Sequence, residues 1–222
     1  SVAVSVSSEP PDDILSKCFD KVISVSYDCE AEQAVRDLTE NKNYISDGII
    51  NPEEYATVKP KILWILKSVR SNSESETWDF RGYMGWNLYK TKSWKNEFGA
   101  LVRSSYGLIN NIHDIGKIRH ISDFSKDEVN EIMQSIAVIN IKKNPATRNL
   151  GLEEVRKEYL EKSDFIQEQI SLIDPDIIIN CTGVQECYED CRRSGKFKVV
   201  NADNPAQFRI SKNEYCGKIL SE

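Results

Sequence analysis

The sequence KILWIL at residues 61–66 decides the fold, because it is a short apolar run that ends abruptly in polar residues. Three later runs have the same form: IAVINI (136–141), DIIINC (176–181) and KFKVVN (196–201). Runs that are rich in Ile and Val, with little alternation of polar and apolar residues, are typical of strands buried on both faces of a parallel sheet. The four runs therefore predict a central four-stranded parallel sheet.

Segments with helical patterns lie between these runs. Residues 153–173 form the longest one, and a shorter segment from Trp94 to Tyr106 is expected to end at Gly107. Ser125 and Glu128 have the spacing of a capping box at the start of another helix. Strands that alternate with helices predict an α/β fold with helices on both faces of the sheet.

The length of 222 residues, 40% of them hydrophobic, is enough for one compact domain with a full core. Residues 1–58 are expected to form an N-terminal arm and an acidic helical preface, and residues 59–222 the α/β core.

Composition excludes several classes of protein. No apolar stretch approaches the ~20 residues that cross a bilayer, and the first residues lack the order of a signal peptide, so we expect a cytoplasmic protein without membrane contact. A net charge of −6 argues against a protein that coats DNA non-specifically, because Lys and Arg supply that affinity. A local basic rim around a pocket remains compatible with this charge.

The six cysteines contain no C-x-x-C pair, and the chain has only two histidines. This composition argues against a zinc site, and we expect reduced cysteines in or near the core and no cofactor. An iron–sulfur cluster held by four of the six cysteines is the alternative that their spacing leaves open.

Polar residues follow each predicted strand, at residues 67–70, 142–145, 182–183 and 201–205. In open α/β sheets, ligands bind outside the carboxyl ends of the strands. Lys67 and Ser68 are therefore candidate substrate-binding residues. Lys142 and Lys143 are either a solvated pair or a clamp for a ligand at the same edge.

Several of these segments, in this order, resemble the uracil-DNA glycosylase superfamily. The resemblance rests on the strand and loop at 62–70, on Val138-Ile-Asn140-Ile, on residues 175–183, and on Asn204-Pro205-Ala206, where members often have His-Pro-Ser. It covers roughly residues 59–220. It is closest to a divergent bacterial branch with Trp-Asp-x-Arg after the first loop, which is Trp78-Asp79-Phe80-Arg81 in this chain.

The resemblance implies a role for Asn140, since members read the base edge with an asparagine on the middle strand, whose amide offers both a donor and an acceptor. The alternative is that Asn140 only caps the end of a strand. Ser68 stands where members place the Asp, Asn or Glu that handles the attacking water. Asn204 replaces a histidine and could donate a neutral hydrogen bond to the departing base.

A serine at position 68 has no charge with which to stabilise a sugar cation, so an acidic residue elsewhere in the chain must supply it. Asp79 is the first candidate for this catalytic role, with Glu74 and Glu76 behind it. The alternative for Asp79 is that it caps a helix.

Aromatic and basic residues supply the remaining candidates. Trp78 and Phe80 could stack on an extruded base, although most of the aromatic cluster at 78–94 is expected to pack in the core. Phe208 and Arg209 follow Pro205, where members of the superfamily place the loop that enters the minor groove. The resemblance therefore implies that Phe208 could enter the groove, with Arg209 and Lys143 at phosphates. Phe208 and Arg209 could equally pack against the terminal helix.

The resemblance implies a DNA glycosylase that flips a base, which can be a modified one, out of DNA and cleaves its N-glycosidic bond, and we expect it to be a monomer. A role in defence against phage DNA would suit a divergent bacterial branch. The competing hypothesis is a nucleotide- or nucleic-acid-binding protein of the same fold that has lost its catalytic groups. A phosphate-handling hydrolase is disfavoured, because the chain lacks the motif G-x-x-x-x-G-K-[ST].

Overall fold

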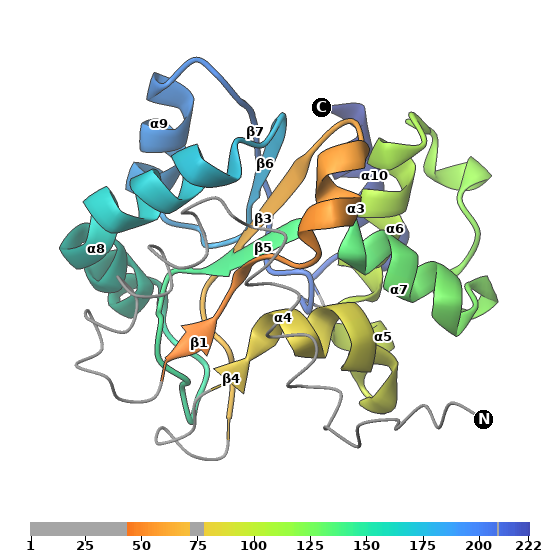
Figure 1. The fold of residues 1–222 in the computed structure, drawn as a ribbon, viewed down its shortest axis with the longest axis horizontal. Coiled ribbons are helices and arrows are strands. Elements are labelled where there is room, and N and C mark those ends of the chain that lie inside the picture. Colours follow the sequence, from red (N-terminus) through yellow and green to blue (C-terminus); the bar gives the residue numbers. More distant parts are fainter. Residues whose placement is uncertain (1–43, 72–77, 208) are drawn as a thin grey trace, which may run out of the picture.

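The computed structural model of the chain describes residues 44–71, 78–207 and 209–222. It is an α/β fold whose five-stranded sheet has the order β2-β5-β3-β6-β7. Helices cover both faces of the sheet (Figure 1).

The four predicted strands all form: β3 (Ile62–Leu66), β5 (Ala137–Asn140), β6 (Ile177–Asn180) and β7 (Lys198–Asn201). These four strands pair with one another in parallel, in the order β5-β3-β6-β7. All five residues of β3 are buried, as expected for a strand covered on both faces.

The sheet differs from the prediction at one edge, where β2 (Gly48–Ile49) pairs antiparallel with β5. The sheet is therefore mixed and five-stranded, rather than four-stranded and parallel. A strand of two residues has no hydrophobic periodicity of its own, and Asp47-Gly48 has the composition of a turn. The sheet thus includes residues that precede position 59, where the sequence places the start of the core.

A small second sheet lies beside the main one and consists of β1 (Ile45–Ser46) and β4 (Trp78–Asp79), paired in parallel. The backbone N–H of Ile45 donates to the carbonyl of Lys143 at 2.7 Å, which attaches β1 to the segment after β5.

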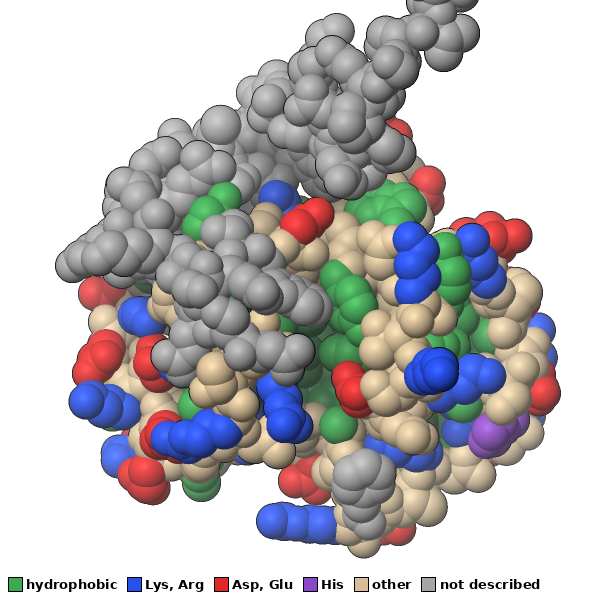
Figure 2. Space-filling model, turned by 90° about the horizontal axis from the view of Figure 1, so that it is seen from below, with side chains coloured by type: hydrophobic (Ala, Val, Ile, Leu, Met, Phe, Trp, Pro, Cys, Tyr) green, Lys and Arg blue, Asp and Glu red, His purple; other side chains and the backbone are tan. Residues whose placement is uncertain are grey.

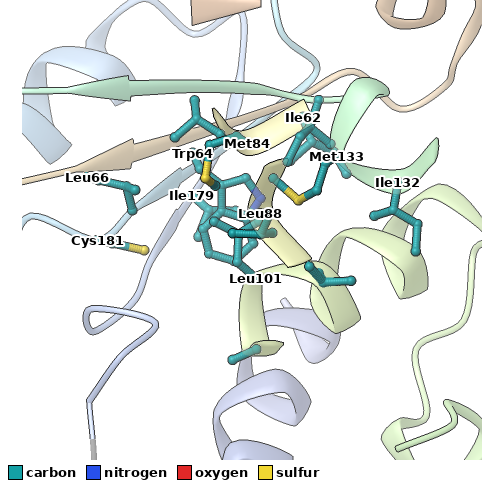
Figure 3. Packing of buried hydrophobic residues seen from close by; sticks show 14 of the residues in the cluster. Ile62, Trp64, Leu66, Met84, Leu88, Leu101, Ile132, Met133, Ile179 and Cys181 are labelled. Atoms are coloured by element: carbon teal, nitrogen blue, oxygen red, sulfur yellow. The ribbon is translucent and has the colours of Figure 1, made fainter. Parts of the chain in front are cut away.

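Alternate residues of the strands face two separate cores. Ile62, Trp64 and Leu66 pack with residues of α6 (Gly99–Ile109), α7 (Lys126–Gln134) and α10 (Lys212–Ser221), as Figure 3 shows for part of this cluster. The opposite core contains Leu63 and Ile65 with residues of α8 (Leu152–Ile173) and α9 (Gln185–Arg193). The buried indole N–H of Trp64 donates to Ser105 Oγ at 3.0 Å.

Local signals place most helices well. The Ser125–Glu128 capping box begins α7, and α8 ends where Asp174 adopts a left-handed conformation with φ 47°. The expected end at Gly107 is wrong, because α6 continues to Ile109. A Cβ atom at Gly107 would lie 2.6 Å from side-chain atoms of Ile118 and Leu220, so this glycine permits close packing and does not end the helix.

The remaining helical elements are short. They are α3 (Pro52–Thr57), α4 (Phe80–Gly82), the π-helix η1 (Tyr83–Asn87), the 3-10 helices η2 (Leu88–Lys90), η3 (Ile115–Lys117) and η4 (Ile121–Asp123), and α5 (Trp94–Glu97). No helix of the described segments is long and apolar enough to cross a membrane.

Candidate functional site

The strand register brings the ends of the four parallel strands to one edge of the sheet. Leu66 pairs with Asn140, and Asn180 pairs with both Ile65 and Asn201. Figure 2 shows the molecule from below, the side on which β1 and β4 lie in Figure 1. Hydrophobic side chains are visible in a hollow on this face, with Lys and Arg side chains on either side of it.

A buried polar cluster lies at this edge and is centred on the carboxylate of Asp47. Its Oδ2 accepts from the backbone N–H of Asn140 at 2.6 Å and from the Asn140 amide at 3.3 Å. Its Oδ1 accepts from Lys143 Nζ at 2.9 Å and from Gln169 Nε2 at 3.0 Å. The carboxylate therefore joins the segment before β2, the end of β5 and the C-terminal part of α8.

Lys143 is fully enclosed, and its side chain has no exposed surface. Besides Asp47, its ammonium group donates to Gln169 Oε1 at 2.7 Å. Burial lowers the pKa of Lys143 because it disfavours the charged form, and the negative charge of Asp47 opposes this shift. A contact between Lys143 and a DNA phosphate would require this ion pair to open, so its position favours a structural role.

Asn140 is completely buried at the end of the middle strand β5. Of the two ends of the Asn140 amide, only Nδ2 can donate a hydrogen bond to a carboxylate. The contact with Asp47 therefore fixes the orientation of this side chain. Within the described part of the chain, Oδ1 of Asn140 has no hydrogen-bond partner. A buried acceptor without a partner is uncommon in a folded protein and costs about 1–3 kcal/mol.

The same edge contains a second asparagine, Asn180, whose side chain bonds to Thr182 and to Asn201 of the neighbouring strand. Its Oδ1 accepts from the Thr182 hydroxyl at 2.7 Å and from the Thr182 backbone N–H at 3.2 Å, and its Nδ2 donates to Asn201. Asn180 and Thr182 thus shape the turn after β6, in which Gly183 has φ 75°. The need for a further hydrogen-bond partner is therefore less clear for Asn180 and Thr182 than for Asn140.

The two predicted catalytic residues both stabilise local backbone turns. Asp79 is exposed, and its Oδ1 accepts from the backbone N–H of Gly82 at 2.9 Å, which is the capping role that the sequence left open. Asn204 is exposed, and its Oδ1 accepts from the backbone N–H of Ala206 at 2.9 Å. The structure does not bring Asp79 or Asn204 into hydrogen-bonding contact with Asn140.

The other predicted residues lie in different environments. Lys67 and Ser68 are half-buried directly after β3, and Phe80 is buried in the same core cluster as Leu66. Arg209 is exposed before α10. Glu74, Glu76, Phe208 and the side chain of Trp78 lie outside the described residues.

A cavity of about 530 Å³ opens at the ends of β6 and β7 and contacts α10. Asp203, Lys218 and Glu222 line it together with Tyr215, whose hydroxyl donates to the Asp203 carbonyl at 2.7 Å. Cys181 lies behind Tyr215, with Sγ 3.5 Å from the Tyr215 oxygen, and burial raises the pKa of the Cys181 thiol to about 12. This thiol is therefore protonated at neutral pH and is a poor nucleophile.

The described cysteines, Cys181, Cys187, Cys191 and Cys216, are free and buried. In residues 44–71, 78–207 and 209–222, no group of three or more His, Cys, Asp and Glu side chains is placed to hold a metal ion. Cys18 and Cys29 lie outside this part of the chain, so the iron–sulfur alternative stays untested.

Sequence reasoning missed Asp47 and Gln169, although both belong to the cluster around Asn140. Asp47 could have been noticed only as part of the Asp47-Gly48 turn, and Gln169 is one polar residue in a helix of 22 residues. Asp47 and Gln169 are 122 positions apart in the sequence, and no local pattern joins them.

Comparison of the chain with models of known protein families found no match, and neither the curated proteins nor the solved structures that were searched contain a similar one.

Proposed function

We propose that the protein is a DNA glycosylase that holds an extruded base at the carboxyl edge of its sheet and cleaves the N-glycosidic bond. The resemblance to the uracil-DNA glycosylase superfamily supports this proposal. So does the order of the parallel strands, β5-β3-β6-β7, because it sets the asparagine-bearing strand β5 beside β3, the strand that precedes the predicted ligand-binding loop.

The observation that carries the proposal is the unpaired Oδ1 of Asn140. Asp47 holds the other end of this amide, so the side chain cannot exchange its donor and acceptor without placing Oδ1 against a carboxylate. A fixed acceptor can receive a hydrogen bond from a ring N–H or an exocyclic amino group of a base. We infer that the enzyme selects a base with a donor at this position, as uracil and its N3–H derivatives have.

The catalytic charge in this proposal comes from Asp79. One oxygen of its carboxylate caps α4 through Gly82, and Oδ2 is left without a hydrogen-bond partner in the described structure. In water, a carboxylate stabilises a cation about 4 Å away by only about 1 kcal/mol, and the effect increases several-fold where bound DNA excludes water. Asp79 is exposed in the protein alone, so DNA binding must provide this exclusion.

Lys67 and Arg209 are the basic residues that this proposal assigns to DNA. In the described structure neither forms an ion pair with a carboxylate, so both are available to phosphates. We also propose that the enzyme acts as a monomer in the cytoplasm and that its substrates include modified bases of phage DNA. These last points rest on the resemblance and on the departures at Ser68 and Asn204.

A second candidate function is a nucleotide-binding protein that uses the same edge without catalysis. The hydrogen bonds of Asp79 and Asn204 to nearby backbone N–H groups favour this candidate. Both side chains have a structural role, which would keep them in the sequence of a protein that has no catalytic activity. Asn140 would serve such a protein equally well.

The experiment that separates the two is incubation of the protein with single- and double-stranded DNAs that contain uracil or modified bases. Subsequent heating in alkali reveals abasic sites as strand breaks. Breaks at one type of base support the glycosylase. Saturable binding of a nucleotide, without strand breaks in any DNA of the panel, replaces it with the binding protein.

A further inference from the structure

A second cavity, of about 420 Å³, lies away from Asn140, between α5, the start of α6, η4 and the start of α10. Lys95, Arg103, His120 and Lys212 line it, and none of its ten lining residues is acidic. The chain as a whole carries 35 Asp and Glu against 29 Lys and Arg, so this basic lining is not a consequence of composition.

Arg103 provides the strongest reason to expect an anion. It is 96% buried, from a relative exposure of 4%. Its guanidinium donates to the carbonyls of Arg119 at 3.0 Å and Ile118 at 3.3 Å, and to Asn213 Oδ1 at 2.6 Å. A guanidinium has five N–H groups, so these bonds leave two unused. No carboxylate of the described residues pairs with Arg103.

A buried charge normally has a partner of opposite sign, because the loss of hydration is otherwise uncompensated. The three acceptors around Arg103 are neutral and supply dipoles only. Its positive charge therefore remains in a cavity without a negative side chain. An anion that entered this cavity would supply the missing negative charge and could accept hydrogen bonds from the two remaining N–H groups of Arg103.

The start of α10 presents another donor to the same cavity. Ser211 caps this helix through the N–H of Glu214, and the N–H of Asn213 has no partner in the described structure. Exposed N–H groups and the helix dipole both favour an anion at this end of a helix. The Arg103 guanidinium donates to the amide oxygen of Asn213, so the guanidinium lies next to the N-terminus of α10.

His120 completes the set of donors. Its Nδ1 accepts from the backbone N–H of Ser122 at 3.3 Å, so the neutral ring carries its proton on Nε2, where it can be donated to a ligand.

Gly99 allows η4 to approach α6, since a Cβ atom at this position would lie 3.1 Å from Ile121.

The two lysines of the lining have different roles. Lys212 Nζ donates to the carbonyls of Pro205 and Gln207, so it adds positive charge from a fixed position. Lys95 is exposed, and its Nζ lies 5.9 Å from the centre of the Trp94 ring. It can therefore move toward an anion at the mouth of the cavity.

We propose that this cavity is a phosphate-binding site in which the Arg103 guanidinium, the Asn213 N–H and the His120 Nε2–H donate to the phosphate oxygens and Lys95 closes the entrance. The phosphate is that of a nucleotide or of the DNA backbone. The inference rests on the cavity alone and does not require the proposed glycosylase activity.

The test is isothermal titration calorimetry of the full chain with inorganic phosphate, at constant ionic strength maintained with sodium chloride. We expect saturable binding at one site per chain. The double variant Lys95→Ala/His120→Ala changes two exposed side chains. It should raise the Kd for phosphate at least about tenfold, which corresponds to about 1.4 kcal/mol of binding free energy. Lys92→Ala, an exposed lysine of the same segment outside the cavity lining, is the matched control and should bind phosphate as the unaltered protein does.

Arg103→Lys keeps the charge and loses the planar fork, so it should weaken phosphate binding even where the fold is retained. A nucleoside 5′-monophosphate and an unmodified oligonucleotide, each titrated with and without competing inorganic phosphate, identify the source of the phosphate. Competition by either ligand supports the site. The absence of saturable phosphate binding, or unchanged binding by Lys95→Ala/His120→Ala, would overturn the proposal whether or not the protein cleaves DNA.

Discussion

The ammonium nitrogen of Lys143 lies 2.9 Å from Oδ1 of Asp47, and neither side chain is exposed to solvent. The pair connects the residue before β2 to the segment after β5, and Gln169 of α8 bonds to both partners. Through the second carboxylate oxygen the same pair orients the amide of Asn140. The structure of the candidate site therefore depends on an ion pair in the core.

Replacement of Lys143 by methionine leaves the Asp47 carboxylate buried without its counter-charge. We expect Lys143→Met to lower the free energy of unfolding by about 3–5 kcal/mol, measured by urea denaturation. The neighbouring residue Lys142 is half-buried and serves as the control, since Lys142→Met should change stability by less than about 0.5 kcal/mol. The double variant Asp47→Asn/Lys143→Met should recover part of the loss, because no charge remains buried. A Lys143→Met protein of unaltered stability would show that the pair contributes nothing.

Asn140→Ala removes the unpaired acceptor and leaves the backbone bond from Asn140 N–H to Asp47 intact. We expect it to weaken base binding or transition-state stabilisation by about 1–3 kcal/mol, measured as kcat/KM or as the Kd for DNA, with little change in stability. Asn110→Ala is the matched control, because Asn110 is exposed at the end of α6 and does not belong to the candidate site. Equal activity of the two variants would remove Asn140 from the site.

Asp79→Asn tests the source of the catalytic charge. An asparagine caps a helix about as well as an aspartate, so the bond to Gly82 and the fold should persist. We expect base excision to fall by at least about a hundredfold, while DNA affinity, measured by fluorescence anisotropy, is retained. Normal excision by Asp79→Asn would transfer the role to another group, such as Glu74 or Glu76.

Acid should destabilise the protein through Glu128. The hydrogen bond from Arg119, together with that from the Ser125 backbone, lowers the pKa of Glu128 from its ordinary value of 4.5 to about 2. Because the folded-state pKa is the lower one, the stabilising contribution is complete above pH 4.5 and is lost as the pH falls toward 2. Thermal unfolding followed across this range should show a smaller decrease for Glu128→Gln than for the unaltered protein. Glu131→Gln, an exposed change on the same helix, should keep the full decrease.

The sequence alone predicted the parts of the molecule that local chemistry specifies. Apolar runs such as 61–66 are buried on both faces of a sheet because few other environments accept five consecutive hydrophobic residues. The Ser125–Glu128 capping box begins α7 because the two side chains satisfy backbone N–H groups within the same turn. The polar residues after each strand indicated the edge of the sheet at which Asn140 lies.

The tertiary structure decided the rest, because it depends on residues that are distant in the sequence. The strand β2 is only two residues long and exists because β5 pairs with it. Lys143 looked like a surface cation beside Lys142, and only the approach of Asp47 from 96 positions away makes it a buried ion pair. A buried charge is tolerated only where the fold supplies its partner, and composition and periodicity contain no record of which distant residue that partner is.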